Sequence, residues 1–345
     1  MTHQENAAVE ATAQAAKAKK PATITVLKKD LGVALGIEKL TGREIVVPKL
    51  TDTAFACAVS DHYVLREAPL RDLLAYLSFP NNDALMIIGP TGSGKTSLVT
   101  ETAARLGWGV VPITCSGRTE FTDVVGQYVL ASQTPGEQPQ MTFQYGPLAK
   151  AMKEGHIFLI NEFNMLHPDE ASGLNDVLEG RPLVIEANGG EVIRPHPMFR
   201  CVVTANMGKT CEGATYTGTK SQNLAALDRY RVTEVDYPTK EEETLILQRV
   251  APELAPLHEH MINTAQDVRT AHTEGLGDTS LQTTLSTRVL CRWATLTLAY
   301  RAANNAAEYA LERALTLRLP AEEKEAVHQM AKARFGEAWV AKPSA

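Results

Sequence analysis

A glycine-rich run in the first third of the chain carries the residues best suited to chemistry. It fits the pattern G-x-x-x-x-G-K-[ST] and consists of Gly89, Pro90, Thr91, Gly92, Ser93, Gly94, Lys95 and Thr96. Glycines let a backbone wrap closely around an oxyanion. The oxyanion would be attracted by amides that point inward and by the positive end of a helix that starts near Lys95 and Ser97. In a P-loop of this kind, Lys95 contacts the β- and γ-phosphates of ATP and the Thr96 hydroxyl binds Mg²⁺. The run therefore predicts a site for ATP and Mg²⁺.

The context of this run argues against a chance match. By residue frequency, about 1% of chains of this length would fit the pattern by accident. Here an apolar stretch typical of a buried strand, residues 84–88, precedes the run, and a helical stretch, residues 97–102, follows it. Strand, loop and helix in this order are the setting that a P-loop requires.

A second apolar stretch, residues 156–160, ends in two polar residues, Asn161 and Glu162. Hydrolysis of a bound triphosphate needs a residue that orients or deprotonates water, together with charge that stabilises the transition state. A carboxylate directly after a buried strand matches the place of a Walker B motif. Glu162 is therefore the candidate for polarising the attacking water.

Asn161 stands where an aspartate is usual. An asparagine keeps the hydrogen-bonding shape but removes a negative charge from the surroundings of Mg²⁺. In one interpretation Asn161 still orients a water on the metal and hydrolysis survives; in the other, the chain binds ATP and hydrolyses it poorly. We favour the first, because the water-orienting carboxylate is retained and Asn161 acts on the metal only through water.

These residues need a scaffold, and the apolar pattern predicts one. Short apolar runs alternate with helical stretches, which predicts a doubly wound, parallel α/β sheet. The expected strands are residues 84–88, 110–114, 156–160, 201–205 and 232–237. Two hairpins are expected to interrupt the alternation: residues 127–130 with 141–144, and residues 182–187 with 191–193 around an Asn-Gly-Gly turn.

The chain divides into four predicted regions. Residues 1–22 are predicted to be a disordered tail, residues 23–80 a lead-in with a helix near 69–77, residues 81–238 the α/β nucleotide-binding core, and residues 239–345 a helical lid with further C-terminal helices. Pro238 is the expected boundary between core and lid. The lid helices are expected at residues 240–250, 257–273, 286–317 and 321–335.

Composition excludes several classes of protein. The 345 residues suffice for two or three domains, and the net charge of −6 offers no global basic field for nucleic acid or an anionic membrane. No run approaches the roughly 20 apolar residues of a membrane span, and the N-terminal residues lack the apolar core of a secretory signal. The five cysteines are scattered without a CxxC pair, so reduced thiols and a cytoplasmic location are expected, without zinc.

Several stretches resemble the ATPase subunit of aerobic cobaltochelatase, CobS, a branch of the MoxR-type AAA+ ATPases. They are VIRPHPMFR at 192–200, TAN at 204–206, YTGT at 216–219, LDRY at 227–230 and FTDVVG at 121–126. The likeness covers roughly residues 60–240, and the VIRPHPxFR run followed by TAN is typical of this branch rather than of P-loop proteins in general. The resemblance implies an AAA+ core with a C-terminal helical lid.

The resemblance also implies roles for single residues. Asn206 matches sensor 1, which binds the γ-phosphate or the lytic water. Arg229 matches the arginine finger, which reaches the nucleotide of a neighbouring subunit, although Asp228-Arg229 alone would read as a surface ion pair. Arg288 matches sensor 2, with Arg292 one turn further as the alternative.

His196 lacks a partner at ligand spacing, so we expect a structural residue and not a metal ligand.

An arginine finger that acts on a neighbour implies a homo-oligomer, and the relatives form hexamers. The first hypothesis is therefore an ATP-driven ring that remodels a partner protein, which in this family usually carries a von Willebrand A domain. The two hairpins resemble family inserts that engage partners, although ordinary loop elaboration would explain them nearly as well. A nucleotide-gated scaffold with weak hydrolysis is the alternative that Asn161 supports, and a nucleic-acid motor is disfavoured by the acidic charge.

Overall fold

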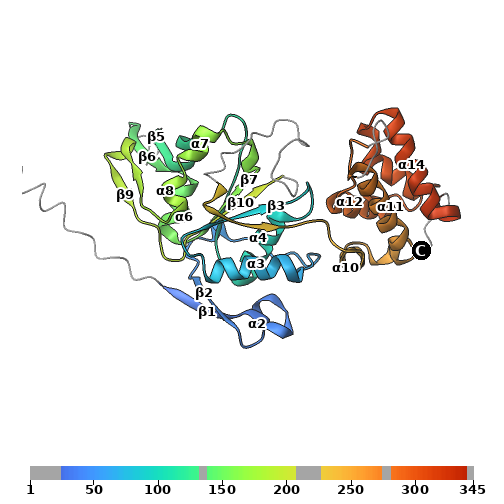
Figure 1. Cartoon of the computed structure of the whole chain (residues 1–345), viewed down its shortest axis with the longest axis horizontal. Coiled ribbons are helices and arrows are strands. Elements are labelled where there is room, and N and C mark those ends of the chain that lie inside the picture. The colour runs from blue at the N-terminus through green and yellow to red at the C-terminus, as the bar shows by residue number, and fades with distance from the viewer. Residues whose placement is uncertain (1–24, 132–137, 207–226, 274–280, 340–345) are drawn as a thin grey trace, which may run out of the picture.

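The computed structural model describes residues 25–131, 138–206, 227–273 and 281–339 (Figure 1). Its centre is a parallel sheet with the strand order β11-β3-β10-β7-β4. The strands are β3 (Ala84–Ile88), β4 (Val110–Thr114), β7 (Ile157–Asn161), β10 (Arg200–Ala205) and β11 (Tyr230–Glu234). The predicted doubly wound α/β sheet is confirmed. The expected tail at residues 1–22 and the YTGT stretch lie outside the described residues.

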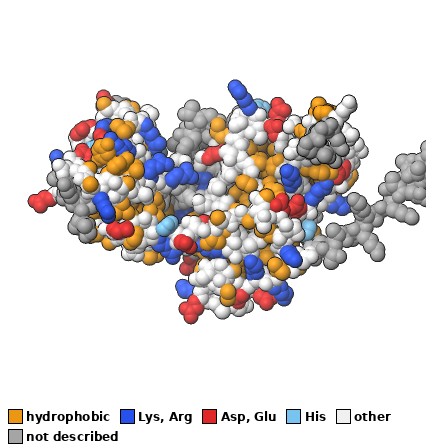
Figure 2. Space-filling model, turned by 180° about the vertical axis from the view of Figure 1, so that it is seen from behind, with side chains coloured by type: hydrophobic (Ala, Val, Ile, Leu, Met, Phe, Trp, Pro, Cys, Tyr) orange, Lys and Arg blue, Asp and Glu red, His pale blue; other side chains and the backbone are white. Residues whose placement is uncertain are grey.

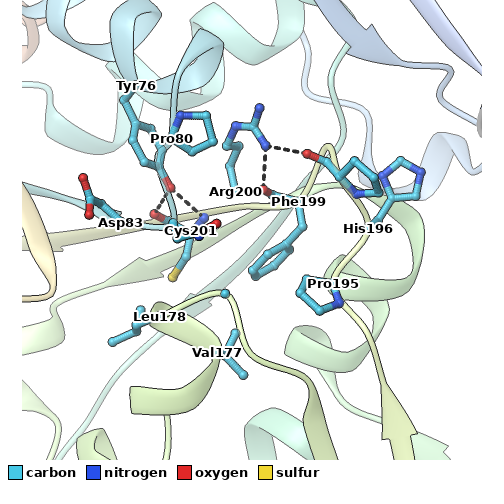
Figure 3. A pocket seen from close by; sticks show the side chains of 13 residues that line it. Tyr76, Pro80, Asp83, Val177, Leu178, Pro195, His196, Phe199, Arg200 and Cys201 are labelled. Atoms are coloured by element: carbon cyan, nitrogen blue, oxygen red, sulfur yellow. Dashed lines mark hydrogen bonds between the residues drawn. The ribbon is translucent and has the colours of Figure 1, made fainter.

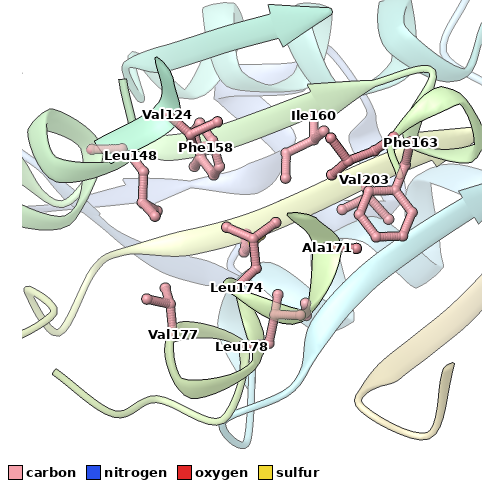
Figure 4. Packing of buried hydrophobic residues seen from close by; sticks show 14 of the residues in the cluster. Val124, Leu148, Phe158, Ile160, Phe163, Ala171, Leu174, Val177, Leu178 and Val203 are labelled. Carbon is pink, nitrogen blue, oxygen red and sulfur yellow. The ribbon is translucent and has the colours of Figure 1, made fainter. Parts of the chain in front are cut away.

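Continuous apolar strands bury side chains on both faces of this sheet. All five residues of β3 are buried. Met86, together with Phe158 and Val203, belongs to a core covered by α5 (Phe121–Val125), α6 (Pro147–Glu154), α7 (Pro168–Ser172) and α8 (Asn175–Leu178). Figure 4 shows Ala171 of α7 and the Val177 and Leu178 side chains of α8 packed near Phe158 and Ile160 of β7 and Val203 of β10.

The opposite face is covered by α3 (Glu67–Ser78), α4 (Lys95–Leu106) and the start of the chain. There, β1 (Val26–Asp30) and β2 (Glu44–Pro48) form an antiparallel hairpin that encloses α2 (Leu31–Leu35). Leu31, Ile45 and Val47 are buried in the same cluster as the apolar residues of α3 and α4. The first residues described thus pack on the sheet domain through its helical layer.

Both predicted hairpins are confirmed. β5 (Gly126–Ala131) pairs with β6 (Gln140–Tyr145), and β8 (Leu183–Ile185) pairs with β9 (Glu191–Ile193). In the second hairpin, Gly189 and Gly190 take φ angles of 65° and 73°, which favour glycine. In Figure 1 the hairpins lie at the far end of the sheet domain from the C-terminal helices.

The C-terminal helices are α10 (Lys240–Val250), α11 (Ala255–Thr273), α12 (Thr287–Ala299), α13 (Ala306–Ala314) and α14 (Ala321–Phe335). They enclose a core of their own that includes Leu247, Met261 and Trp293. Thr239 and Glu242 begin α10 with a reciprocal capping box. Within the described part of the chain, no helix is long and apolar enough to cross a bilayer.

Two predicted elements were wrong in their bounds. The helix expected over 286–317 is broken after Ala299, and Asn305, with φ 61°, precedes the second helix. Asparagine tolerates this left-handed conformation, which a continuing helix excludes. The strand expected over 232–237 begins at Tyr230 and ends at Glu234. Beyond it the chain turns toward the lid, where Pro238 has no N–H to continue a ladder.

Candidate active site

The P-loop connects β3 to α4 and forms an open cradle. A Cβ at Gly89 would lie 2.2 Å from the carbonyl oxygen of Val235, so only glycine lets the loop pass the segment after β11. Gly94 has a φ of 97°, and a Cβ there would have no heavy atom within 4 Å. The buried hydroxyl of Ser93 has no hydrogen-bond partner among the described residues. A buried hydroxyl without a partner, at the start of a helix whose N-cap makes no side-chain hydrogen bond, suits an oxyanion such as a phosphate.

Lys95 lies over this cradle. Its Nζ donates to the carbonyls of Gly89 (2.9 Å) and Pro90 (2.8 Å) and to Oδ1 of Asn206 (2.7 Å). Burial lowers the pKa of Lys95 to about 8; Arg288 adds to this effect, whereas the carboxylate of Glu162 opposes it. The ammonium group is therefore fixed in direction and raised in free energy, which favours an anionic ligand.

Asn206 connects Lys95 to Glu162. Its Oδ1 accepts from Lys95, and its Nδ2 donates to Oε2 of Glu162 at 2.6 Å. Its backbone N–H is held by Oδ1 of Asn164 at 3.1 Å. Because β3, β7 and β10 are parallel neighbours, the residues that follow them meet at one edge of the sheet. The structure thus brings the expected sensor 1 residue, the P-loop lysine and the candidate carboxylate into one hydrogen-bonded chain.

Glu162 has an unusual backbone for its type. It takes φ 55° and ψ 42°, the left-handed region, at the end of β7. Non-glycine residues held in this region cost of order 1–3 kcal/mol and cluster at functional sites. The conformation ends the strand abruptly and directs the carboxylate to Asn206.

Asn161 lies between the strand ends and Thr96. Its Oδ1 accepts from the hydroxyls of Thr96 (2.7 Å) and Thr204 (3.3 Å), and its Nδ2 donates to the carbonyl of Ile113 (3.3 Å). This donor set consists of oxygen atoms, which Mg²⁺ prefers, and Mg²⁺ usually combines one or two protein ligands with water and substrate phosphates. The residues therefore fit Mg²⁺, with one negative charge fewer than an aspartate would give.

The substitution Asn161→Asp restores that charge. We expect the Mg²⁺ concentration for half-maximal phosphate release to fall by about tenfold, because partners of metal-bound groups change affinity or activity by 10–100-fold. A Mg²⁺ titration of ATP turnover measures it. Asn304→Asp adds the same charge at an exposed lid residue and serves as the control. An identical Mg²⁺ dependence in all three proteins would place Asn161 away from the metal.

Arg229 lies at the opposite edge of the sheet. Its carbonyl accepts from the amide of Ala84, the first residue of β3, whereas the P-loop follows the last residue of that strand. A five-residue strand spans roughly 16 Å, so Arg229 does not belong to the cradle of its own subunit. Its Nε donates to Oε1 of Glu179 at 2.7 Å, and Arg181 pairs with the other oxygen of that carboxylate at 2.5 Å.

The lid touches the P-loop at the start of α12. A Cβ at Gly92 would lie 2.6 Å from the Cβ of Ser286 and 3.6 Å from that of Arg288. Ser286 caps this helix through its hydroxyl. Arg288 lines the cavity beside the P-loop, and Arg292 does not. Of the two sensor 2 candidates, the structure therefore brings Arg288 to the site.

That cavity has a volume of about 320 Å³ and includes residues that sequence reasoning missed. It lies between the P-loop, the segment before α3 and the lid. Tyr63, Val64, Ile246 and Val250 give it an apolar wall that suits a nucleotide base. Two hydrogen bonds cross from that segment to the lid: His62 Nδ1 with the carbonyl of Arg249 (2.7 Å), and Arg249 Nη1 with the carbonyl of Tyr63 (2.7 Å). No motif marked these residues, because they lie far apart in the chain.

Figure 2 shows lysine and arginine side chains on the part of the lid that faces the sheet domain. Arg288 is one arginine that lines the cavity between them. Positive charge on the lid side of this cavity favours a polyphosphate over a neutral ligand.

A second cavity, of about 240 Å³, lies at the amino ends of β3 and β10 (Figure 3). The branch-specific run at 192–200 forms part of its wall. Nδ1 of His196 accepts from the amide of Met198 (3.0 Å), and Arg200 donates to the carbonyls of Leu77, Pro197 and Phe199. Burial lowers the pKa of His196, and His156 and Arg200 act in the same direction. Within the described ranges, no three acidic, histidine or cysteine residues are grouped to hold a metal ion.

Comparison with known proteins gives two family matches. Residues 84–219 match the AAA domain of the dynein-related subfamily, and residues 243–334 match the C-terminal domain of CbbQ, NirQ and NorQ. An uncharacterized protein of Staphylococcus epidermidis is 33% identical over 198 residues, 57% of this chain and 72% of the relative. An uncharacterized protein of Staphylococcus aureus is 33% identical over 202 residues, with the same two coverages.

Among solved structures, the chain is similar to a protein of Cytophaga hutchinsonii that is described as an inferred ATPase. The identity is 15%, the TM-score is 0.41, and the match covers 79% of this chain and 89% of that one. This likeness is too weak to bear on function.

Proposed function

The chain belongs to the MoxR-type AAA+ ATPases, and on this premise we propose that a ring of its copies uses ATP hydrolysis to remodel a partner protein. The observation that carries the proposal is the hydrogen-bonded chain from Lys95 through Asn206 to Glu162. It joins a phosphate-binding cation to a carboxylate able to polarise water, which hydrolysis requires and nucleotide binding alone does not.

In the proposed mechanism each residue has one task. The P-loop amides and Lys95 bind the β- and γ-phosphates, and the apolar wall of the cavity holds the base. Thr96 would hold Mg²⁺ directly and Asn161 would do so through water, and the metal would neutralise developing charge on the phosphates. Glu162 takes the proton of the attacking water at its carboxylate, and Asn206 orients both. Arg288 contacts the γ-phosphate from the lid.

Arg229 completes the site of a neighbouring subunit in this proposal. Its position at the far edge of the sheet supports a role in trans, because a nucleotide in its own cradle is out of reach. The transition state of phosphoryl transfer carries charge that a guanidinium stabilises. A closed ring gives every copy a neighbour, and a hexamer is the state we propose.

The two hairpins support a protein partner. Leu130 pairs across β5 and β6 with Met141, and Val184 pairs across β8 and β9 with Val192; all four side chains are more than half exposed. Exposed apolar clusters of this kind mark surfaces for other proteins. A von Willebrand A domain as the partner, chaperone activity and a cytoplasmic location belong to this proposal, and the likeness to CobS stays a prediction.

A scaffold that binds ATP and scarcely hydrolyses it is the second candidate. The asparagine that faces Thr96 favours it, because the position lacks the charge that usually helps to hold Mg²⁺. A nucleic-acid motor is less favoured, since the net charge of −6 gives no general attraction for phosphate backbones.

The first test is ATP binding by the full chain with Lys95→Met, read by the fluorescence of a labelled ATP. We expect the dissociation constant to rise at least 100-fold, since hydrogen bonds between charged groups contribute about 1.5–3 kcal/mol and the lost cation adds to this. Lys332→Met, at an exposed lid position, is the matched control. Equal affinity in the variant and the wild type would remove the basis of the proposal.

The same measurement has a pH signature. Burial lowers the pKa of Lys95 to about 8, so the unliganded protein loses this proton between about pH 7 and pH 9. A phosphate requires the protonated form. Wild-type affinity is therefore expected to fall about tenfold per pH unit above pH 8, whereas Lys95→Met is expected to show no such slope.

A further inference from the structure

A buried ion pair joins two helices of the lid. Glu243 of α10 is fully buried, and Arg269 of α11 donates to both of its oxygens, from Nη1 at 3.1 Å and from Nη2 at 2.8 Å. Removing two charges from water costs free energy that even a bidentate pair barely offsets, and apolar residues of similar volume often stabilise a protein equally well. Stability alone therefore does not account for this pair, and its contacts indicate what it does.

One side of the pair reaches the P-loop through Tyr237. The guanidinium carbon of Arg269 lies 4.3 Å from the centre of the Tyr237 ring, in cation–π geometry. The Tyr237 hydroxyl donates to the carbonyl of Thr91 at 3.0 Å. Tyr237 belongs to the segment between β11 and α10, which connects the sheet to the lid. Arg269 therefore packs against this segment at the residue through which the segment contacts the P-loop.

The other side reaches the start of α12. The Thr287 hydroxyl donates to Oε1 of Glu243 at 3.0 Å, and Nε of Arg269 donates to the carbonyl of Leu285 at 2.8 Å. These two bonds bracket Ser286, which abuts Gly92, and they immediately precede Arg288. One ion pair thus holds two lid contacts of the P-loop, at Thr91 and at Gly92.

We propose that Glu243 and Arg269 are positioning residues that set Tyr237 and Arg288 against the P-loop, so that ATP turnover depends on them although neither lines the nucleotide cavity. The inference rests on the proposed function, since it assigns Arg288 to the γ-phosphate. Arginine is required at 269, because its planar group serves Glu243, Leu285 and the Tyr237 ring together. A lysine ammonium has no planar face or fixed fork to do so.

The test is a double-mutant cycle on kcat/KM for ATP in the full chain. Arg269→Lys is expected to lower kcat/KM by about tenfold or more. In an Arg288→Ala background the same substitution is expected to lower kcat/KM by only a few-fold, because the part of its effect that acts through Arg288 is lost and only the part that acts through Tyr237 remains. An undiminished, additive loss in that background would overturn the proposal.

The matched control is Arg334→Lys. Arg334 donates to both oxygens of Asp267 on the same helix α11, at 2.6 Å and 2.7 Å, but it lies outside the network that reaches the P-loop. It is expected to leave kcat/KM within twofold of the wild type. Equal losses for Arg334→Lys and Arg269→Lys would indicate a general weakening of the lid and would overturn the positioning role.

Two further variants separate positioning from folding. Tyr237→Phe removes only the hydroxyl that contacts Thr91 and is expected to weaken ATP binding a few-fold with an unchanged melting temperature. Glu243→Met with Arg269→Met replaces the pair by apolar side chains, and we expect a folded lid with kcat/KM at least tenfold below wild type. Wild-type turnover in the folded Met pair would contradict the inference.

The positioning role can be tested even if the proposed motor function is wrong. A wild type that binds ATP and does not turn it over would refute the motor and leave the positioning role to be read from labelled-ATP affinity. In that case Arg269→Lys and Tyr237→Phe are expected to raise the dissociation constant by at least threefold and Arg334→Lys by less than twofold. Equal dissociation constants in all four proteins would refute the positioning role.

Discussion

Arg229→Ala is expected to lower ATP turnover of the assembled ring by about 1000-fold or more, with ATP affinity nearly unchanged. An arginine supplied in trans contributes 10³–10⁵ to the rate of phosphoryl transfer, because it stabilises charge that develops only in the transition state. The side chain lies at the far edge of the sheet from the P-loop of its own subunit. Steady-state phosphate release with gel filtration of the same sample measures both turnover and assembly.

Arg181→Ala is the matched control, because Arg181 pairs with the same carboxylate of Glu179 and has no expected catalytic role. A second experiment mixes two inactive variants and tests directly whether Arg229 acts in trans. Subunits with Arg229→Ala keep an intact nucleotide site, and subunits with Glu162→Gln keep an intact arginine finger. If the finger acts in trans, co-assembled rings of the two inactive variants regain activity at mixed interfaces. Activity absent from every mixture would place Arg229 in its own subunit's chemistry or outside catalysis.

Glu162→Gln is expected to slow phosphate release by about 100-fold or more while ATP stays bound. A general base contributes typically 10²–10⁴ to a rate, and glutamine keeps an oxygen that accepts from Asn206 but cannot take a proton. Binding of labelled ATP and release of phosphate are measured on the same preparation. Glu253→Gln, at an exposed lid position, controls for the loss of a negative charge.

This substitution also separates the motor from the scaffold. A motor gives a fast wild type and a slow variant that retains ATP and holds the ring together. A scaffold gives equally slow release from both proteins, since Asn161 has then already removed effective hydrolysis. The second result would sink the remodelling proposal and leave nucleotide-gated assembly in its place.

Local patterns in the sequence determined the parts of the site that are contiguous in the chain. The P-loop could be predicted because its candidate phosphate-binding groups are consecutive residues between an apolar strand and a helix. Asn161 and Glu162 could be predicted as candidate site residues because they come at the end of a buried strand. Most element bounds followed from apolar runs and caps, and the failures at 232–237 and 286–317 came where the linker to the lid and a left-handed Asn305 ended a regular pattern.

Only the tertiary structure decided how these pieces meet. The strand order β11-β3-β10-β7-β4 places the ends of β3, β10 and β7 side by side, which joins Lys95, Asn206 and Glu162 although up to 111 residues separate them. It also selects Arg288 over Arg292 and builds the cavity from Tyr63 and Val250, residues in no motif. The physical reason is that apolar periodicity indicates only which face of each helix or strand is buried. Contacts within the site depend instead on which segments, distant in the chain, pack together in the whole fold.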